Sequence, residues 1–357
     1  MSSTNEEKIK ASLGAYIRAL PKAEIHLHLE GSIHPERFLS LSRKYQTEYQ
    51  NLSPKELEET LFKYDNFWDF LGTFKVVSQH LREPQDYIDL VNDLHKYLVR
   101  QNIRYSEVFF APSVPAKLGF DVGDIIAAIL SQGREVEKQG EVQLRWIFDC
   151  VRQFGIESAQ QTAQLAVENA EEGVVALGLG GDEMVSPTQE FEEIFSWARA
   201  HQLHIHVHAG EIGGPSSVWD AVQVLGADRI GHGIQAARDP KLIEYLKNHT
   251  IALDVCLTSN AKTKAWTPVA QNPFGLLFKR GVPVTLSTDD PGLFSTDLEE
   301  EYRIACRYFD LSKSDLAYIS MQGVRSSFLP YQDRMTLMQD FQDTIHQINQ
   351  SCNSEAD

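Results

Sequence analysis

Residues 24–30 read EIHLHLE, and this stretch decides the fold. Its polar and apolar residues alternate, which is the periodicity of a β-strand. One face is expected to carry Ile25, Leu27 and Leu29, and the other Glu24, His26, His28 and Glu30. Two imidazoles on one strand face are neighbours in space, and neutral imidazole is the commonest metal ligand. The stretch therefore predicts a strand that supplies two ligands to a metal site, with the others coming from elsewhere in the chain.

The same kind of strand recurs along the chain, nearly always followed by a helical pattern. Strands are predicted at 24–30, 104–111, 144–151, 174–179, 203–209, 229–233, 251–257 and 283–288. Helices are predicted at 122–138, 156–170, 187–201, 217–225, 240–248 and 273–279, and from there to about residue 350. Eight βα repeats indicate a closed parallel barrel, a (β/α)8 TIM barrel in the α/β class. The alternative is an open doubly wound sheet, but no GxGxxG follows the first strand.

Residues 1–357 are expected to form one domain with a helical insertion after the first strand. The insertion, residues 34–100, is unusually aromatic, with Phe67, Trp68, Phe70 and Phe74 close together. Aromatic residues at helical spacing usually belong to a core. Their position after a ligand-bearing strand also suits a lid. A helix is predicted before the first strand, over residues 5–20, and residues 351–357 are predicted to be a disordered tail.

The composition excludes several classes of protein. The chain has 33 Lys+Arg and 50 Asp+Glu, giving a net charge of −17, which argues against a nucleic-acid partner. No stretch has the length of apolar sequence that a membrane-spanning helix needs, and the first residues do not resemble a secretory signal. The four cysteines form no CxxC pair, which favours free thiols and a cytoplasmic location.

Two later strands share the polar face of the first. His204, His206 and His208 alternate with apolar residues in one, and Thr285, Ser287 and Asp289 do so in the other. Buried polar groups need partners, and a bound cation is the simplest common one. The candidate ligands at the carboxyl ends of these strands are His26, His28, His208 and Asp289. Three imidazoles and a carboxylate suit one zinc ion, or a competing divalent transition metal, which lowers the pKa of bound water to about 7.

Further polar residues lie beside these ligands in the sequence. Glu211 can act as a general acid, or simply as a carboxylate at a helix start. His232 can orient or deprotonate a water, or bond to a backbone carbonyl. Asp290 is expected to face away from the metal if the strand continues, and either to bind substrate or to cap a turn. Gly181 permits close approach of a planar ligand, or a tight turn.

Five motifs, in this order and spacing, resemble the adenosine deaminase family of the amidohydrolase superfamily. They are HLHLEGS (26–32), GGDE (180–183), HAGE (208–211), RIGHG (229–233) and STDDP (287–291). The resemblance extends over nearly the whole chain. It implies a hydrolytic deaminase with one zinc ion and a small-molecule purine nucleoside as substrate.

The resemblance also implies a role for each residue. His26, His28, His208 and Asp289 would bind zinc. Glu211 would protonate the purine nitrogen beside the amino-bearing carbon, and His232 and Asp289 would orient and activate the water. Asp290 would bond the five-membered ring and the Gly181 backbone the six-membered ring. His28 and Glu30 are also expected to contact the substrate.

The motifs bear on the choice of substrate. Typical adenosine deaminases carry Asp, facing the ribose 5′-hydroxyl, where this chain has Glu30. The run GGPSSVWDA (213–221) resembles bacterial members that deaminate 6-aminodeoxyfutalosine, an adenine nucleoside with a large aryl group beyond the sugar. Gly231 argues against free adenine, since adenine-specific relatives vary RIGHG toward RIDHG. Adenosine is therefore expected first, 6-aminodeoxyfutalosine second and adenine third.

Two other classes remain as alternatives. One is a catalytically silent barrel that binds a purine nucleoside, which need not keep the full set of ligands together with Glu211 and His232. The other is a two-metal hydrolase of the phosphotriesterase type. Such enzymes usually carry a bridging lysine on strand four, and residues 174–179 contain none.

Overall fold

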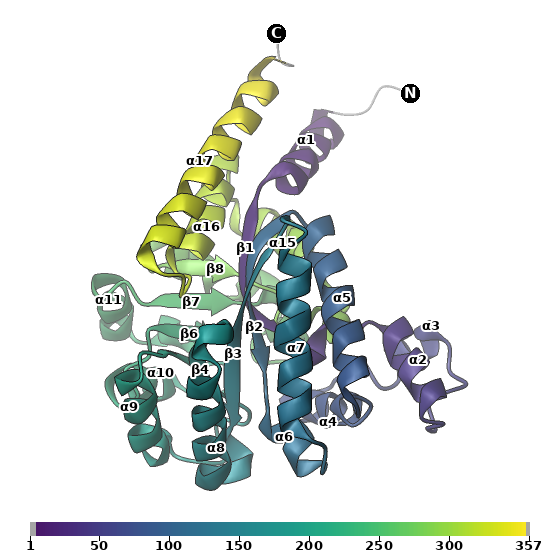
Figure 1. The fold of residues 1–357 in the computed structure, drawn as a ribbon. Helices are drawn as coiled ribbons and strands as arrows, with labels where there is room; N and C mark the ends of the chain where they lie inside the picture. Colours follow the sequence, from purple (N-terminus) through teal and green to yellow (C-terminus); the bar gives the residue numbers. More distant parts are fainter. Residues whose placement is uncertain (1–4, 355–357) are drawn as a thin grey trace.

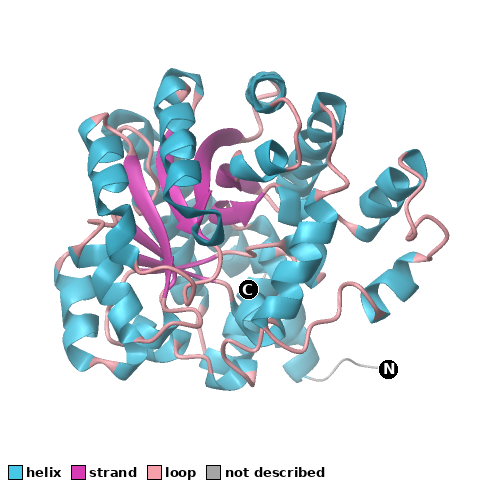
Figure 2. Cartoon of the chain, turned by 90° about the horizontal axis from the view of Figure 1, so that it is seen from below, coloured by secondary structure: helices cyan, strands magenta, loops and turns pink. Residues whose placement is uncertain are grey.

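The fold is an eight-stranded parallel barrel surrounded by helices (Figures 1 and 2). The computed structural model describes residues 5–354, with side chains for residues 12–351. Each strand pairs with the next one along the chain. The strands are β1 (Lys22–His28), β2 (Ile103–Phe110), β3 (Gln143–Val151), β4 (Val174–Gly180), β5 (His204–Ala209), β6 (Arg229–His232), β7 (Ala252–Val255) and β8 (Val284–Leu286). The predicted (β/α)8 TIM barrel is confirmed.

Helices connect successive strands and pack around them. The main ones are α1 (Asn5–Ala19), α5 (Pro84–Arg100), α7 (Val122–Glu137), α8 (Gly155–Glu168), α9 (Glu192–Ala200), α10 (Pro215–Gln223), α11 (Pro240–Asn248), α13 (Phe274–Lys279), α15 (Leu298–Phe309), α16 (Lys313–Arg325) and α17 (Tyr331–Ser354). The remaining helices are α2 (Pro35–Lys44), α3 (Pro54–Glu59), α4 (Phe67–Ser78), α6 (Ser113–Lys117), α12 (Leu257–Lys262) and α14 (Pro291–Phe294), with 3₁₀ turns η1 (Glu30–Ser32), η2 (Arg152–Phe154), η3 (Ala170–Glu172), η4 (Thr188–Phe191), η5 (Ile234–Arg238) and η6 (Val269–Gln271). Helix α17 extends to Ser354, so the tail predicted to be disordered from residue 351 is helical as far as the structure describes it; residues 355–357 lie outside the described residues.

The barrel closes between β1 and the segment just after β8. Asp289 forms a parallel bridge with Leu27, because its N–H donates to the His26 carbonyl over 3.1 Å and its carbonyl accepts from the His28 N–H over 2.8 Å. The strand predicted over 283–288 is therefore shorter than expected, and its pairing with β1 passes through Asp289 itself.

A β-bulge interrupts the alternation predicted for the first strand. Glu24 pairs with Ser106 but Leu27 pairs with Val108, so β1 has one residue more than β2 over this interval. The Glu24 carboxylate accepts from the N–H and hydroxyl of Thr288, over 3.0 and 2.6 Å, whereas Ile25 packs in a different cluster from Leu27. The prediction that Glu24 shares a face with the two histidines is wrong, because the extra residue shifts the period before His26.

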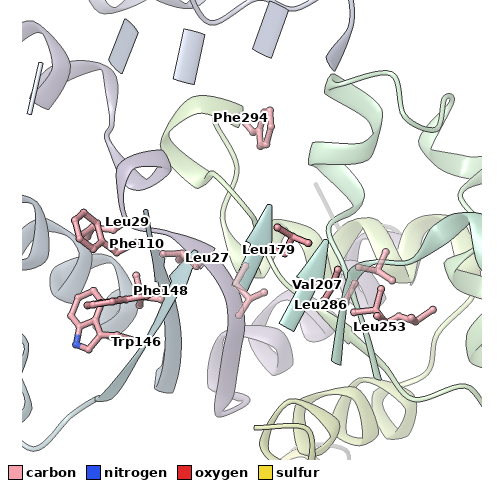
Figure 3. Close-up of a cluster of buried hydrophobic side chains, with 14 of the residues drawn as sticks. Leu27, Leu29, Phe110, Trp146, Phe148, Leu179, Val207, Leu253, Leu286 and Phe294 are labelled. Atoms are coloured by element: carbon pink, nitrogen blue, oxygen red, sulfur yellow. The ribbon is translucent and has the colours of Figure 1, made fainter. Parts of the chain in front are cut away.

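The apolar faces of the strands pack against the helices in one large core. Ten of its side chains are labelled in Figure 3, among them Leu27 of β1, Val207 of β5 and Leu286 of β8. Cys150 and Cys256 are fully buried free thiols. Among the described residues, no helix is long and apolar enough to cross a membrane.

The insertion after β1 is helical, as predicted, and consists of α2 to α5. Figure 1 shows α2 and α3 at one side of the barrel, with α4 lying closer to it. The indole Nε1 of Trp68 on α4 donates to Asp182 Oδ2, beyond β4, over 2.8 Å. The Tyr64 hydroxyl donates to the Leu293 carbonyl over 3.0 Å. The insertion is thus fastened to loops at the carboxyl ends of the strands; movement as a lid stays a prediction.

Candidate active site

Four side chains converge at the carboxyl ends of β1, β5 and β8. The Nε2 atoms of His28 and His208 lie 3.3 Å apart, and Asp289 Oδ1 lies 3.3 Å from the Nε2 atoms of both His26 and His28. One ligand atom from each of the four residues can be chosen so that all lie within 4.8 Å of one another. The predicted ligand set is therefore assembled at one point, although its members span more than 260 positions of the sequence.

The donor atoms fit a divalent transition metal. Neither ring nitrogen of His26 has a hydrogen-bond partner, although the residue is fully buried, and an orphaned buried imidazole is costly unless something binds it. His208 Nδ1 faces the Leu179 carbonyl over 3.3 Å, so a proton on Nδ1 leaves the lone pair of Nε2 directed at the site. Burial lowers the pKa of His208 well below its ordinary value, which keeps this imidazole neutral. Three imidazoles and one carboxylate at this spacing make a candidate metal centre.

The Asp289 carboxylate is positioned by a left-handed backbone conformation and by a hydrogen bond to its second oxygen atom. Burial would raise its pKa, but the His26 and His28 imidazoles hold the pKa well below the usual range, so the carboxylate is ionised. The Ser259 hydroxyl donates to Oδ2 over 2.7 Å, leaving Oδ1 to face the imidazoles. Asp289 and His232 both adopt left-handed backbone conformations, with φ of 67° and 61°. Such conformations are uncommon outside glycine and often occur at functional sites.

Glu211 lies beside the ligand cluster, as predicted. Its Oε2 is 3.6 Å from His232 Nε2, and its Oε1 accepts from the Thr263 hydroxyl over 3.3 Å. Burial, and then the nearby carboxylates of Asp289 and Glu183, raise its pKa well above the ordinary value. A carboxyl group that retains its proton near neutral pH can serve as a general acid.

The position of Glu211 depends on Glu183, the last residue of the GGDE motif. The Glu183 carboxylate accepts hydrogen bonds from four successive backbone N–H groups, those of residues 210–213, over 2.7 to 3.3 Å. The Ser217 hydroxyl donates to the same carboxylate. The loop that carries Glu211 is therefore folded around one side chain from the neighbouring strand end.

A chain of amides determines which nitrogen of His232 bears the proton. The Phe274 N–H can only donate, so the Asn272 oxygen that faces it over 3.0 Å accepts. Asn272 Nδ2 then donates to Asn260 Oδ1, and Asn260 Nδ2 donates to His232 Nδ1, each over 3.2 Å. With Nδ1 as acceptor, the proton of the neutral ring sits on Nε2, which faces Glu211 and also Asp289 Oδ2, 3.8 Å away.

Asp290 does not turn away from the ligands as expected. It lines the same cavity as Asp289, because the left-handed backbone at Asp289 ends the strand alternation. Burial and the adjacent Asp289 raise the Asp290 pKa well above its ordinary value. A Cβ at Gly31 would lie 1.7 Å from its Oδ1, so glycine there leaves room for this carboxyl group.

Gly181 and Glu30 differ in how they meet the cavity. Gly181 lines it in a left-handed conformation, and a Cβ there would lie 2.2 Å from Gln153 Oε1. Glu30 is not among the residues that line the cavity; it is buried, and Oε1 accepts from the Ala111 N–H over 3.4 Å. The expected contact of Glu30 with substrate stays a prediction.

Not every polar residue of the three strand faces reaches the site. His204 is exposed and stacks on Phe328, with ring centroids 4.6 Å apart, while Thr285 donates to Asp254 over 2.8 Å. His206 also contacts Asp254, over 3.1 Å, below the metal ligands. His206 and Thr285 therefore belong to a buried polar layer deeper in the barrel, and His204 lies at the far end of the barrel.

The ligand cluster opens into a cavity of about 610 Å³. His28, His208, Glu211, His232, Asp289 and Asp290 form its polar end. Helices α4 and α6 and the segment after β3 form most of the remaining wall, with Phe67, Phe70, Leu71, Phe74, Val114, Leu118, Val151 and Phe154. The volume is in the range of about 300–1,000 Å³ that is typical of small-molecule sites.

A sequence model of the adenosine deaminase family matches residues 21–344. The chain belongs to the adenosine deaminase family. It is 37% identical to the aminodeoxyfutalosine deaminase of Streptomyces coelicolor over 323 residues, which cover 90% of this chain and 83% of that protein. It is 33% identical to an adenosine deaminase of Klebsiella pneumoniae over 336 residues, covering 90% and 97%. The crystal structure of Arabidopsis ADAL complexed with IMP matches with a TM-score of 0.83 and 26% identity, covering 93% of this chain and 99% of that one.

Membership of this family confirms the resemblance seen in the five motifs and makes the chain an aminohydrolase. Several residues of the site were not singled out from the sequence, among them Asp149, Asn260 and Asn272. Asp149 had one signal, since it is a lone carboxylate in the apolar run of residues 144–151. The two asparagines lie in polar segments where nothing local marks them.

Proposed function

We propose that this chain is a zinc-dependent deaminase of an adenine nucleoside that carries a large substituent at the 5′ position, the type that 6-aminodeoxyfutalosine represents. The observation that supports it most is the placement of Glu211, a buried carboxyl group with a raised pKa, beside four assembled metal ligands and inside a cavity of nucleoside size. A silent binding protein would have no need of that combination.

The proposed reaction divides among the residues as follows. A zinc ion held by His26, His28, His208 and Asp289 would supply an acidified water at neutral pH. Glu211 donates its proton to the ring nitrogen beside the amino-bearing carbon, which makes that carbon electrophilic. His232, with its proton on Nε2, donates a hydrogen bond toward the water and orients it. Water adds at this carbon. One of its two protons goes to the amino group, which leaves as ammonia, and the other returns to the Glu211 carboxylate, so a hypoxanthine nucleoside is formed.

Two further groups hold the purine in this proposal. Asp290 keeps a proton because its pKa is raised, so it can donate to a nitrogen of the five-membered ring. The Gly181 backbone can approach the six-membered ring closely because no side chain intervenes. The ring is thus held at both edges while its amino-bearing carbon faces the metal ligands.

The 5′ substituent is favoured by the apolar end of the cavity. Adenosine has little apolar surface beyond its ring, whereas this wall carries Phe67, Phe70, Phe74 and Phe154. Two exposed lysines, Lys75 and Lys117, also line it, which would favour a negatively charged group at that end. The Streptomyces coelicolor relative, with 37% identity, is named for such a nucleoside. These observations support our proposal of the substituted nucleoside ahead of adenosine, the reverse of the order expected from the motifs.

Adenosine is the second candidate, supported by the 33% identity to the Klebsiella pneumoniae enzyme. Gly231, which argues against free adenine, makes room for two imidazoles, because a Cβ there would lie 2.7 Å from His26 and 2.9 Å from His206.

The cytoplasmic location and the lack of a nucleic-acid partner stay predictions from the composition.

The test is a paired assay on the zinc-loaded protein that follows loss of the adenine chromophore. 6-Aminodeoxyfutalosine and adenosine are compared by kcat/KM under the same conditions, with free adenine as a third substrate. The proposal predicts the highest kcat/KM for 6-aminodeoxyfutalosine. A higher value for adenosine would leave a deaminase but reject the 5′ substituent, and no turnover of any of the three with zinc bound would reject the proposed function.

A further inference from the structure

Asp149 has a buried carboxyl oxygen at the cavity that no group of the protein satisfies. Asp149 follows Ile147 on the face of β3 that points into the barrel, and only 5% of it is exposed. It lines the cavity together with His28, Gly181 and His208. Its Oδ1 is buried without a hydrogen-bond partner, and within residues 12–351 the Asp149 carboxyl group forms neither a side-chain hydrogen bond nor an ion pair. Leaving such a group unsatisfied is costly, so a partner from outside the chain is expected.

The space that Asp149 occupies is provided by two glycines of the neighbouring strand. Asp149 pairs with Gly178 in the β3–β4 register. A Cβ at Gly178 would lie 2.3 Å from Asp149 Oδ1, and one at Gly180 would lie 2.4 Å from Oδ2. Any other residue at either position would displace the carboxyl group. Packing against the backbone of these two glycines therefore fixes the orientation of the Asp149 carboxyl group. The carboxyl oxygens remain able to accept hydrogen bonds.

The chemistry of the proposed substrate identifies the missing partner. An adenine nucleoside carries hydrogen-bond donors on its 6-amino group and on its sugar hydroxyls. The amino group is already directed at the metal ligands and Glu211. The hydroxyls are the donors that remain, and Asp149 lines the same cavity as His28 and Gly181, where a hydroxyl of the bound nucleoside can reach it.

We propose that Asp149 is a substrate-binding residue that accepts a hydrogen bond from a sugar hydroxyl and so selects nucleosides over the free base. This assignment rests on the proposed function, because it requires an adenine nucleoside in the cavity. It goes further by naming the residue that recognises the sugar. The motifs place a sugar contact on Glu30, whereas this proposal gives one to Asp149, which lines the cavity.

The test compares Asp149→Ala and Asp149→Asn with the wild type on adenosine, on its 2′-, 3′- and 5′-deoxy analogues and on adenine. Loss of a hydrogen bond costs about 3- to 10-fold in kcat/KM at a neutral carboxyl group and about 10- to 100-fold at a charged one. Asp149→Ala should lose this factor on adenosine. It should lose nothing on the one analogue that lacks the bonded hydroxyl, and nothing on adenine. Asp149→Asn retains an acceptor oxygen of the same shape and should recover most of the loss.

Bound zinc is measured for each variant, and each should hold as much as the wild type. An equal loss on every substrate, adenine included, or a loss of zinc would overturn the assignment and give Asp149 a role in the metal centre or the fold. Unchanged kcat/KM on adenosine would overturn it as well. If the alanine variant does not fold, the test relies on the asparagine variant and on the wild type with the deoxy analogues. A wild-type kcat/KM that is the same for all three deoxy analogues as for adenosine contradicts the proposal. A wild type that turns over none of these purines removes the proposed function, and Asp149's role with it.

Discussion

The N–H of His28 donates to the carbonyl oxygen of Asp289 over 2.8 Å, and this hydrogen bond helps to close the barrel. The two side chains meet as well, with His28 Nε2 3.3 Å from Asp289 Oδ1. Barrel closure and assembly of the candidate metal centre are therefore one structural event. Loss of a ligand and loss of the fold must be separated experimentally, and β5 offers a matched pair for this purpose.

His208→Ala and His204→Ala make that comparison. Both histidines lie on β5, but His208 is a candidate ligand whereas His204 is exposed and stacks on Phe328. Removing His208 should lower zinc affinity by more than about 100-fold and abolish activity, since even the groups that only orient ligands are worth about 10- to 100-fold. His204→Ala should keep both zinc and activity. Metal analysis after dialysis, with circular dichroism as the control for folding, measures this. Full zinc occupancy in His208→Ala would reject the ligand set.

Glu211→Gln removes the acidic proton without changing the size of the side chain. General acid–base catalysis typically contributes about 10²- to 10⁴-fold, and kcat should fall by that amount with zinc retained. The amide still fits beside Thr263 and His232, so KM should change little. Steady-state kinetics with metal analysis measures this. Turnover close to wild type would exclude Glu211 as the general acid.

Asn260→Asp reverses the hydrogen bond that the amide chain presents to His232. A carboxylate can only accept, so it would draw the proton to Nδ1 and leave Nε2 without one in the neutral ring. We expect kcat to fall about 100-fold, since a triad histidine in the wrong tautomer costs up to about 10⁴. Nitrogen-15 chemical shifts of the His232 ring report the tautomer directly. A variant that keeps its proton on Nε2 and its full kcat would show that the amide chain does not control the ring.

Glu301→Gln tests a buried carboxyl group away from the chemistry. Its carboxylate accepts from the Leu257 and Thr258 N–H groups and from Thr296, over 2.8, 3.2 and 3.0 Å, and burial raises its pKa to about 7. The folded protein thus holds a proton there that the unfolded chain releases above about pH 4.5. Its contribution to stability is lost as pH rises toward 7 and is constant above it.

Glutamine cannot titrate, so the free energy of unfolding of Glu301→Gln, relative to wild type, should increase between about pH 4.5 and 7 and then level off. Urea denaturation of both proteins at several pH values measures this difference. Parallel stability curves through this range would contradict the raised pKa.

The fold could be predicted from the sequence because each barrel strand carries its own periodicity and each is followed by a helix. The sequence did not indicate the places where tertiary contacts interrupt the alternation of residues along a strand. The bulge before His26 reverses the expected face of Glu24, and the left-handed Asp289 brings Asp290 into the cavity. Both depend on how β1 and β8 meet, which no local pattern records.

The candidate metal ligands were predictable because they lie in pairs or next to other polar residues at strand ends. Asp149, Asn260 and Asn272 were not, because each acts through a neighbour that is distant in the sequence. Asp149 becomes informative only when Gly178 and Gly180 are seen to leave room for it, and Asn260 only when His232 is found 3.2 Å away.

The most direct test of the central claim follows the oxygen atom of the reaction. The zinc-loaded protein is incubated with 6-aminodeoxyfutalosine in H₂¹⁸O, and the product is analysed by mass spectrometry while ammonia is measured in parallel. Hydrolytic deamination predicts one ¹⁸O at the carbon that lost its amino group, one ammonia released for each product formed, and no product from Glu211→Gln on the same timescale. Unchanged nucleoside after prolonged incubation, with zinc and nucleoside both bound, would contradict the account and indicate a binding protein instead.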